Sequence, residues 1–191
     1  MSVKRRDRLM FGLVIAAALG SANAALAQGS AQESAHRFVL VQNDLDEAMK
    51  NEAFDAAKYT LFAQQARERG NQALAAVFER VANTEKTDHF RKLAALSGHE
   101  TAMEQAEQQA ELAKLPNKSD EANLRDAMTT ERFQANALRS DMVNRAIKYG
   151  DLQAANMFLN IGNGEIKNLL AFRAAKKLAK QSQPQGAPVQ S

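Results

Sequence analysis

Apolar residues recur every three or four positions from about residue 38 to residue 180, which is the spacing of a buried face on an α-helix. The same segment is rich in Ala, Leu, Glu, Gln, Lys and Arg, all of which favour helices. Glycines and one proline-containing run interrupt the pattern and mark the joints between helices. We therefore expect an all-α domain with helices at about 40–69, 71–97, 119–149 and 151–180.

The joints divide these helices into two pairs. Gly70 and Gly150 separate the helices within each pair, and Gly98 is expected to end the second helix. Residues 115–120 (Leu-Pro-Asn-Lys-Ser-Asp) break the chain and then cap the third helix. The stretch before them, residues 100–114, is predicted to be a polar helical crossover. The Pro- and Gly-containing tail, residues 181–191, is expected to be disordered.

An internal repeat relates the two halves of the chain. Residues 45–52 match residues 124–131 at an offset of 79, and the second helices of the two halves match at an offset of 80. The matched positions of the second helices include Gly70 and Gly150, Ala75 and Ala155, Phe78 and Phe158, and Glu85 and Glu165. Two repeated helical hairpins joined by a long crossover predict a four-helix bundle of the ferritin-like type over residues 36–180.

One glutamate interrupts the apolar face of each expected helix, at positions Glu52, Glu85, Glu131 and Glu165. A solvated glutamate would lie on the opposite side of its helix. Burying four carboxylates together is costly unless they are protonated, paired with cations or bound to metal. No Lys or Arg lies near them on the same stripe, so we expect a site for two divalent metal ions. A hydrogen-bonded core of protonated glutamates without metal is the alternative.

Polar residues close to the four glutamates are further candidates. Asp88 and Gln134, each three residues after a glutamate, are candidate ligands or hydrogen-bond partners of ligands. At the two equivalent positions, Asp55 is equally well explained as a solvated side chain, and Asn168 is a neutral, weak ligand. His89 is the one histidine that the pattern brings within reach of the site. It is a candidate metal ligand, although a structural role explains it as well.

Tyr59 lies two helical turns after Glu52 on the same face. Its hydroxyl could hydrogen-bond a ligating carboxylate, or the phenol could act as a redox-active group beside the metal ions. A core aromatic residue with a satisfied hydroxyl is an equally good explanation. We take Tyr59 as the candidate catalytic residue.

These segments resemble the rubrerythrin family of the ferritin-like superfamily. Residues 51–63, with a glutamate and a tyrosine seven residues later, resemble the first ligand helix of that family, and residues 78–86 resemble the second. The resemblance covers about residues 40–175. It implies a bundle that holds two metal ions, iron or alternatively manganese, and that reacts with peroxide or dioxygen or oxidises Fe²⁺. It also implies a homodimer.

The resemblance implies a ligand pattern that this sequence follows only in part. The family pattern is Glu on the first helix, Glu-x-x-His on the second and fourth, and Glu-x-x-Glu on the third. The four glutamates are present, but Asp88, Gln134 and Asn168 occupy the three remaining positions. His89 could replace the first missing histidine through a local distortion such as a π-bulge.

The absence of cysteine from the sequence leaves no counterpart of the cysteine-ligated iron in the family's rubredoxin tail. Electrons would then come from Fe²⁺ itself or from an external donor. The expected function is therefore a di-metal oxidoreductase. The alternatives are a non-catalytic metal-binding protein and a structural bundle that keeps the glutamates as relics.

Residues 1–27 have the pattern of a cleaved signal peptide. Four basic residues precede an apolar run at 9–20, and small residues allow cleavage after Ala24 or Ala27. A retained N-terminal anchor is the alternative. The pattern predicts a periplasmic or secreted protein without membrane attachment after cleavage. Cleavage also removes four basic residues and one acidic residue from a chain of formal net charge +3. The mature chain would be nearly neutral, which gives no indication of nucleic-acid binding.

Overall fold

A computed structural model describes residues 39–98, 100 and 105–181. The chain divides into two compact units after Leu40, and the first lies almost entirely outside the described residues. The signal peptide expected at residues 1–27 lies there too, as do residues 182–191 of the tail expected to be disordered. The second unit, Val41–Ser191, contains the helices of the bundle.

All regular secondary structure in the described residues is helical. The elements are helix 39–68, α2 (Gln72–Thr84), η1 (Glu85–Phe90), α3 (Arg91–Ser97), α4 (Gln105–Lys114), α5 (Asp120–Asn136), η2 (Ala137–Met142), α6 (Val143–Lys148) and α7 (Leu152–Gln181). Both η elements are π-helical turns within longer helices, so α2–η1–α3 and α5–η2–α6 are each one continuous rod. Within this part of the chain, no helix combines the length and apolarity needed to cross a membrane.

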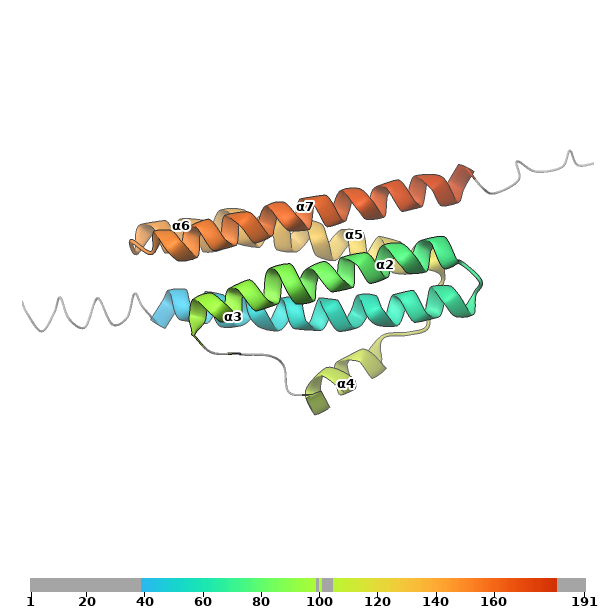
Figure 1. Cartoon of the computed structure of the whole chain (residues 1–191), viewed down its shortest axis with the longest axis horizontal. Helices are drawn as coiled ribbons and strands as arrows, with labels where there is room; N and C mark the ends of the chain where they lie inside the picture. The colour runs from blue at the N-terminus through green and yellow to red at the C-terminus, as the bar shows by residue number, and fades with distance from the viewer. Residues whose placement is uncertain (1–38, 99, 101–104, 182–191) are drawn as a thin grey trace, which may run out of the picture. The chain divides into compact units, whose positions relative to one another are not determined.

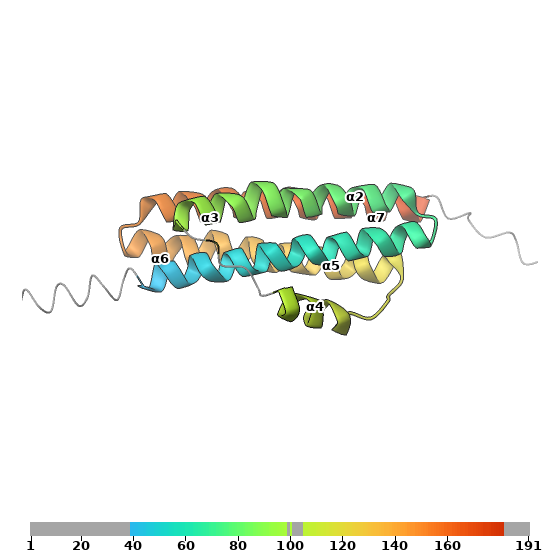
Figure 2. The same cartoon turned by 60° about the horizontal axis from the view of Figure 1, so that its bottom comes forward.

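The four long rods lie side by side in both views (Figure 1, Figure 2). They are helix 39–68, the α2–η1–α3 rod, the α5–η2–α6 rod and α7. The crossover helix α4 lies outside them, next to helix 39–68, where Gln108 Nε2 donates a hydrogen bond to the carbonyl of Ala53 at 3.2 Å. The all-α, ferritin-like four-helix architecture predicted from the sequence is confirmed.

The expected joints form as the sequence suggested. Gly70 and Gly150 have φ values of +78° and +80°, which residues with a Cβ rarely adopt. The next residue in each case caps the following helix, because the side chains of Asn71 and Asp151 accept hydrogen bonds from backbone N–H groups. Ser119 caps α5 in the same way. These turns set the antiparallel direction of the paired helices and so the height of each glutamate in the bundle.

Two apolar clusters fill the bundle on either side of the glutamates. On every rod, members of one cluster precede the glutamate in sequence and members of the other follow it. The first cluster includes Leu45, Met49, Leu93, Phe158 and Ile161, and the second includes Tyr59, Phe62, Phe78, Leu124 and Phe172. Aromatic rings of the second cluster pack with centroids 5.3 to 6.3 Å apart. The glutamates therefore occupy a central layer that apolar packing separates from both ends of the bundle.

Candidate metal centre

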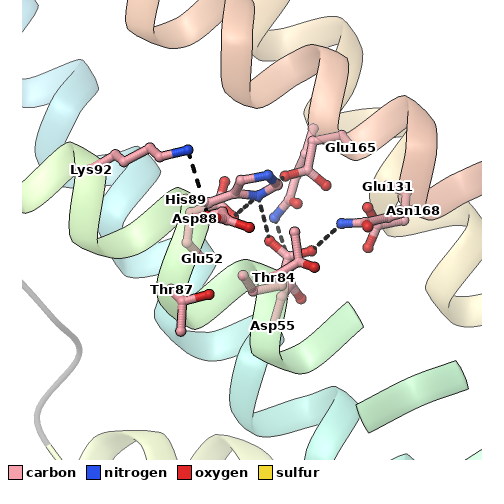
Figure 3. A network of polar contacts seen from close by, with 12 residues as sticks. Glu52, Asp55, Thr84, Thr87, Asp88, His89, Lys92, Glu131, Glu165 and Asn168 are labelled. Atoms are coloured by element: carbon pink, nitrogen blue, oxygen red, sulfur yellow. Dashed lines mark hydrogen bonds and ion pairs between the residues drawn. The ribbon is translucent and has the colours of Figure 1, made fainter. Parts of the chain in front are cut away.

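Four side chains converge in this central layer, and Figure 3 shows three of them, Glu52, His89 and Glu165, directed toward one another. Glu52 from helix 39–68, Glu85 and His89 from η1, and Glu165 from α7 each offer one potential ligand atom, and these atoms all lie within 4.8 Å of one another. All four side chains are buried, with exposed fractions of 4% or less. The structure thus brings together three of the four predicted glutamates and the candidate histidine.

The Nδ1 atom of His89 lies against three carboxylates at once. Its distances are 2.8 Å to Glu85 Oε2, 3.0 Å to Glu165 Oε1 and 3.1 Å to Glu52 Oε2. An imidazole nitrogen carries at most one proton, so it can satisfy only one of these oxygens well. Neither carboxylate oxygen of Glu165 has a hydrogen-bond partner in good geometry. When its carboxylates are ionised, the cluster therefore presents more buried negative oxygen than the imidazole can satisfy, and a bound cation would match it.

The π-helical turn η1 determines which side chain of this rod joins the cluster. A π turn holds one more residue than an α turn, so it changes which following residue shares the face of Glu85. His89 consequently points into the bundle, whereas the carboxylate of Asp88 is 59% exposed and lies 3.6 Å from Lys92 Nζ. The local distortion considered from the sequence is present. The placement of Asp88 among the candidate ligands is corrected, because the same distortion turns Asp88 away from the cluster.

The ring of His89 lies over the backbone of Gly164, the residue before Glu165. A Cβ atom at Gly164 would collide with His89 Nε2 and would lie 2.8 Å from His89 Cε1. Glycine in a helix interior costs about 1 kcal/mol relative to alanine. The position requires glycine, because the imidazole of His89 occupies the space that a side chain at this position would need. Sequence reasoning missed this residue, although an interior helical glycine beside a candidate ligand was a visible signal.

The fourth predicted glutamate, Glu131, is completely buried beside the cluster but is held separately. The Tyr59 hydroxyl donates a hydrogen bond to Glu131 Oε1 at 2.6 Å, while Glu131 Oε2 has no partner. Tyr59 therefore makes the carboxylate contact that was one of its sequence-based interpretations. Asn168, like Tyr59, donates a hydrogen bond to a carboxylate: its Nδ2 lies 2.6 Å from Glu85 Oε1. Asn168 is therefore a hydrogen-bond donor to a candidate ligand.

Gln134 belongs to a second buried polar group near the cluster. Its Nε2 donates a hydrogen bond to Asp55, and Asp55 Oδ1 lies 2.6 Å from Lys58 Nζ. Lys58 also donates to Thr130 Oγ1 at 2.9 Å. The suggestion that Asp55 is solvated is wrong, since only 2% of this residue is exposed. Lys58 was overlooked as its cation, although the three-residue spacing is typical of helix ion pairs.

Burial and mutual proximity shift the pKa values of the cluster upward. Burial, followed by the charges of Glu165 and Glu85, raises the pKa of Glu52 well above 4.5. Burial and the charge of Glu165 likewise raise the pKa of Glu85, and burial and the contact with Glu165 raise that of Glu131. Burial alone would lower the pKa of His89, but the contacting carboxylates reverse this and raise it.

The pKa of Tyr59 is also raised, first by burial and then by the charges of Asp55 and Glu131. Its phenol therefore stays protonated at neutral pH and keeps donating its hydrogen bond to Glu131. Because Tyr59 also packs in the aromatic cluster, its ring orientation is fixed on both sides. A protonated, fixed phenol holds the carboxylate of Glu131 in a single position next to the convergent ligands.

Three convergent carboxylates, a fourth beside them and one imidazole in a four-helix bundle define a carboxylate-rich metal-binding site. Hard oxygen donors with a single nitrogen suit iron or manganese better than copper. The family model described as Rubrerythrin matches residues 43–176, which is well over half of the chain. The chain belongs to the rubrerythrin family. No curated protein and no solved structure matches it.

Proposed function

We propose that the protein is a di-metal carboxylate oxidoreductase that uses two iron ions, or manganese ions in their place, to react with peroxide or dioxygen or to oxidise Fe²⁺. The observation that carries the proposal is the contact of His89 Nδ1 with three carboxylates in a buried central layer. Family membership supports it independently. Bound metal ions would neutralise the buried charge and supply the redox chemistry.

The residues would be shared unequally between the two ions. Glu52, Glu85, His89 and Glu165 would together hold the first ion, and Glu131, buried beside them, would help to hold the second. His89 would give the site its single imidazole ligand, whereas amides, Gln134 and Asn168, occupy two positions where the family pattern has Glu and His. Asn168 already donates its N–H to Glu85, which orients that carboxylate rather than ligating.

The surrounding residues would control access and protons. The aromatic cluster around Tyr59 excludes water from one side of the site, which strengthens electrostatic interactions within it. The Tyr59 hydroxyl is the nearest protein O–H to Glu131 with a defined contact, at 2.6 Å, so it is the group placed to donate a proton there. The pair of Asp55 and Lys58 balances its own charge and leaves the cluster's negative charge for the metal ions.

Anaerobic loading with Fe²⁺ followed by mixing with dioxygen or hydrogen peroxide tests the proposed activity. We expect rapid oxidation of bound Fe²⁺, followed by absorbance of ferric carboxylate species, and turnover when a reductant is supplied. Tyr59→Phe should keep the metal but oxidise it about 10² times more slowly, if the hydroxyl acts as an acid–base group. Leu61→Val, a conservative change elsewhere on the same helix, serves as the control. Metal that binds but never oxidises with either oxidant would contradict the proposed activity.

A non-catalytic metal-binding protein is the second candidate. The observation that favours it is the pair of amides, Gln134 and Asn168, at two positions where the family pattern has Glu and His, since amide side chains are weaker ligands than carboxylate or imidazole. The oxidation experiment separates the two candidates, because sequestration requires equilibrium binding but no reaction. A structural bundle without metal would fail both measurements.

We also propose that the mature protein acts outside the cytoplasm, after cleavage of the leader pattern at residues 1–27. An external electron donor would then supply the site, since the sequence contains no cysteine with which to hold an iron–sulfur or rubredoxin-type centre. The family resemblance suggests a homodimer. Mass determination of the secreted chain tests cleavage and assembly together.

A further inference from the structure

A pocket of about 170 Å³ leads from the protein surface to the candidate metal centre. It lies between helix 39–68 and the α5–η2–α6 rod, and its lining includes Glu52 of the cluster and Gln134. Both of these side chains are at least nine-tenths buried, whereas Glu47 and Asp141, which also line the pocket, are exposed. The pocket therefore joins exposed carboxylates at its mouth to a cluster carboxylate at its inner end.

The second π-helical turn, η2, forms much of the pocket wall. Four lining residues belong to this turn, namely Ala137, Leu138, Asp141 and Met142. A π turn is wider than an α turn and interrupts the regular packing of a helix against its neighbour. The corresponding stretch of helix 39–68 in the first half of the repeat is regular α-helix. Of these two equivalent stretches, only the one that lines the pocket is π-helical.

The charges around the mouth favour a cation. Arg145 lines the pocket, but Asp44 binds its guanidinium through two hydrogen bonds of 2.7 and 2.8 Å. Since Asp44 matches the charge of Arg145, the carboxylates of Glu47 and Asp141 leave the mouth net negative. A surface potential of this sign raises the local concentration of cations and the rate at which they arrive.

The inner end offers a further ligand atom for a cation. Gln134 is 8% exposed, and its Oε1 atom is buried without a hydrogen-bond partner, while its Nε2 donates to Asp55. Amide oxygens are common ligands of hard divalent cations. Glu52 lines the same pocket and belongs to the cluster, with its Oε2 atom 3.1 Å from His89 Nδ1. A ligand oxygen is therefore available at each stage from the mouth to the cluster.

We propose that this pocket is the route by which a divalent metal ion reaches the buried cluster. Glu47 and Asp141 attract the ion, and Gln134 Oε1 and Glu52 receive it inside. A water molecule occupies about 30 Å³ in the liquid, so the pocket has room for an ion with several of its waters. The inference rests on the proposed function only in requiring that the cluster binds metal.

Stopped-flow mixing with Co²⁺ tests the route, because the visible absorbance of Co²⁺ reports binding to a Glu and His site directly. We expect the double variant Glu47→Gln with Asp141→Asn to bind the same amount of Co²⁺ with an association rate lowered about tenfold at low ionic strength. The difference should shrink at high salt, because salt screens surface charges. Ala137→Phe, which narrows the pocket, should slow binding at every salt concentration.

The matched control is Glu68→Gln with Glu79→Gln, which removes two exposed carboxylates away from the pocket. This variant should keep the wild-type association rate. Equal rates in the pocket variants and the control would overturn the proposed route while leaving the metal site intact. Failure of the wild-type chain to bind Co²⁺ at equilibrium would instead contradict the proposed function, and the route with it.

Discussion

Replacing Gly164 with alanine is expected to weaken metal binding by roughly 10- to 100-fold without altering any ligand. The new Cβ atom would collide with His89 Nε2 and lie 2.8 Å from His89 Cε1, so the ring would have to leave its position among the carboxylates. Helix propensity alone would favour the substitution by about 1 kcal/mol. Titration of the chelator-treated protein with Mn²⁺ or Co²⁺ measures the loss of affinity directly.

Gly162→Ala is the matched control for this prediction. It makes the same change two residues earlier in α7, where the new Cβ atom would lie 2.5 Å from Arg139 Cγ and 3.2 Å from Leu138 Cβ. Both neighbours have to shift, the exposed Arg139 by turning its side chain and the buried Leu138 by a few tenths of an ångström, but neither is a candidate ligand. Metal affinity should therefore stay within about twofold of the wild type, a difference of about 0.4 kcal/mol. Equal affinities for the two variants would refute the role assigned to Gly164.

The pH dependence of stability should change sign when metal binds. In the metal-free chain, the raised pKa values of Glu52, Glu85 and Glu131 mean that the folded state retains protons that the unfolded state has released. Stability is then greatest below the unfolded value of about 4.5 and is lost as the pH rises toward the folded values. The raised pKa of His89 acts in the same direction above its usual value of 6.5. Each proton that the folded state retains lowers the free energy of unfolding by about 1.4 kcal/mol for every rise of one pH unit.

Metal binding reverses this slope because the ion requires ionised carboxylates and a neutral imidazole. Unfolding in urea between pH 5.5 and 8 should show stability falling with pH in chelator and rising with pH in excess Mn²⁺. Glu131→Gln should flatten the chelator profile, because it removes one of the titrating groups, whereas Glu121→Gln at an exposed position should not. Parallel profiles with and without metal would contradict the assignment of these carboxylates to a metal site.

Much of the fold and part of the site could be predicted from the sequence. The repeat and the glycine joints predicted the four-helix architecture. A π turn or a polar side chain changes a helix only locally and leaves the connections between helices unchanged, so neither affected this prediction. The apolar stripes predicted burial of all four glutamates, and each is indeed buried. A glutamate on the apolar face of a helix is a strong and unusual signal, because burying a carboxylate is costly.

The details that the sequence did not reveal depend on contacts between helices. Regular helical spacing could not decide between Asp88 and His89, since only the π turn η1 selects one of them. The hydrogen bond from Gln134 to Asp55 joins two rods at positions 79 residues apart in the chain. The need for glycine at Gly164 arises from a ring on another rod. None of these relations has a period that a single helix could display.

The most direct test of the account is metal analysis by inductively coupled plasma mass spectrometry on the chain purified without an affinity tag. The comparison is Glu85→Gln with Glu165→Gln, which keeps the shape of both side chains but removes two of the carboxylates of the buried cluster. We predict about two equivalents of iron or manganese in the wild-type protein, with the second lost more easily on dialysis, and little metal in the variant. Wild-type protein that folds cooperatively, contains no metal and cannot be loaded with Fe²⁺ or Mn²⁺ would contradict the account.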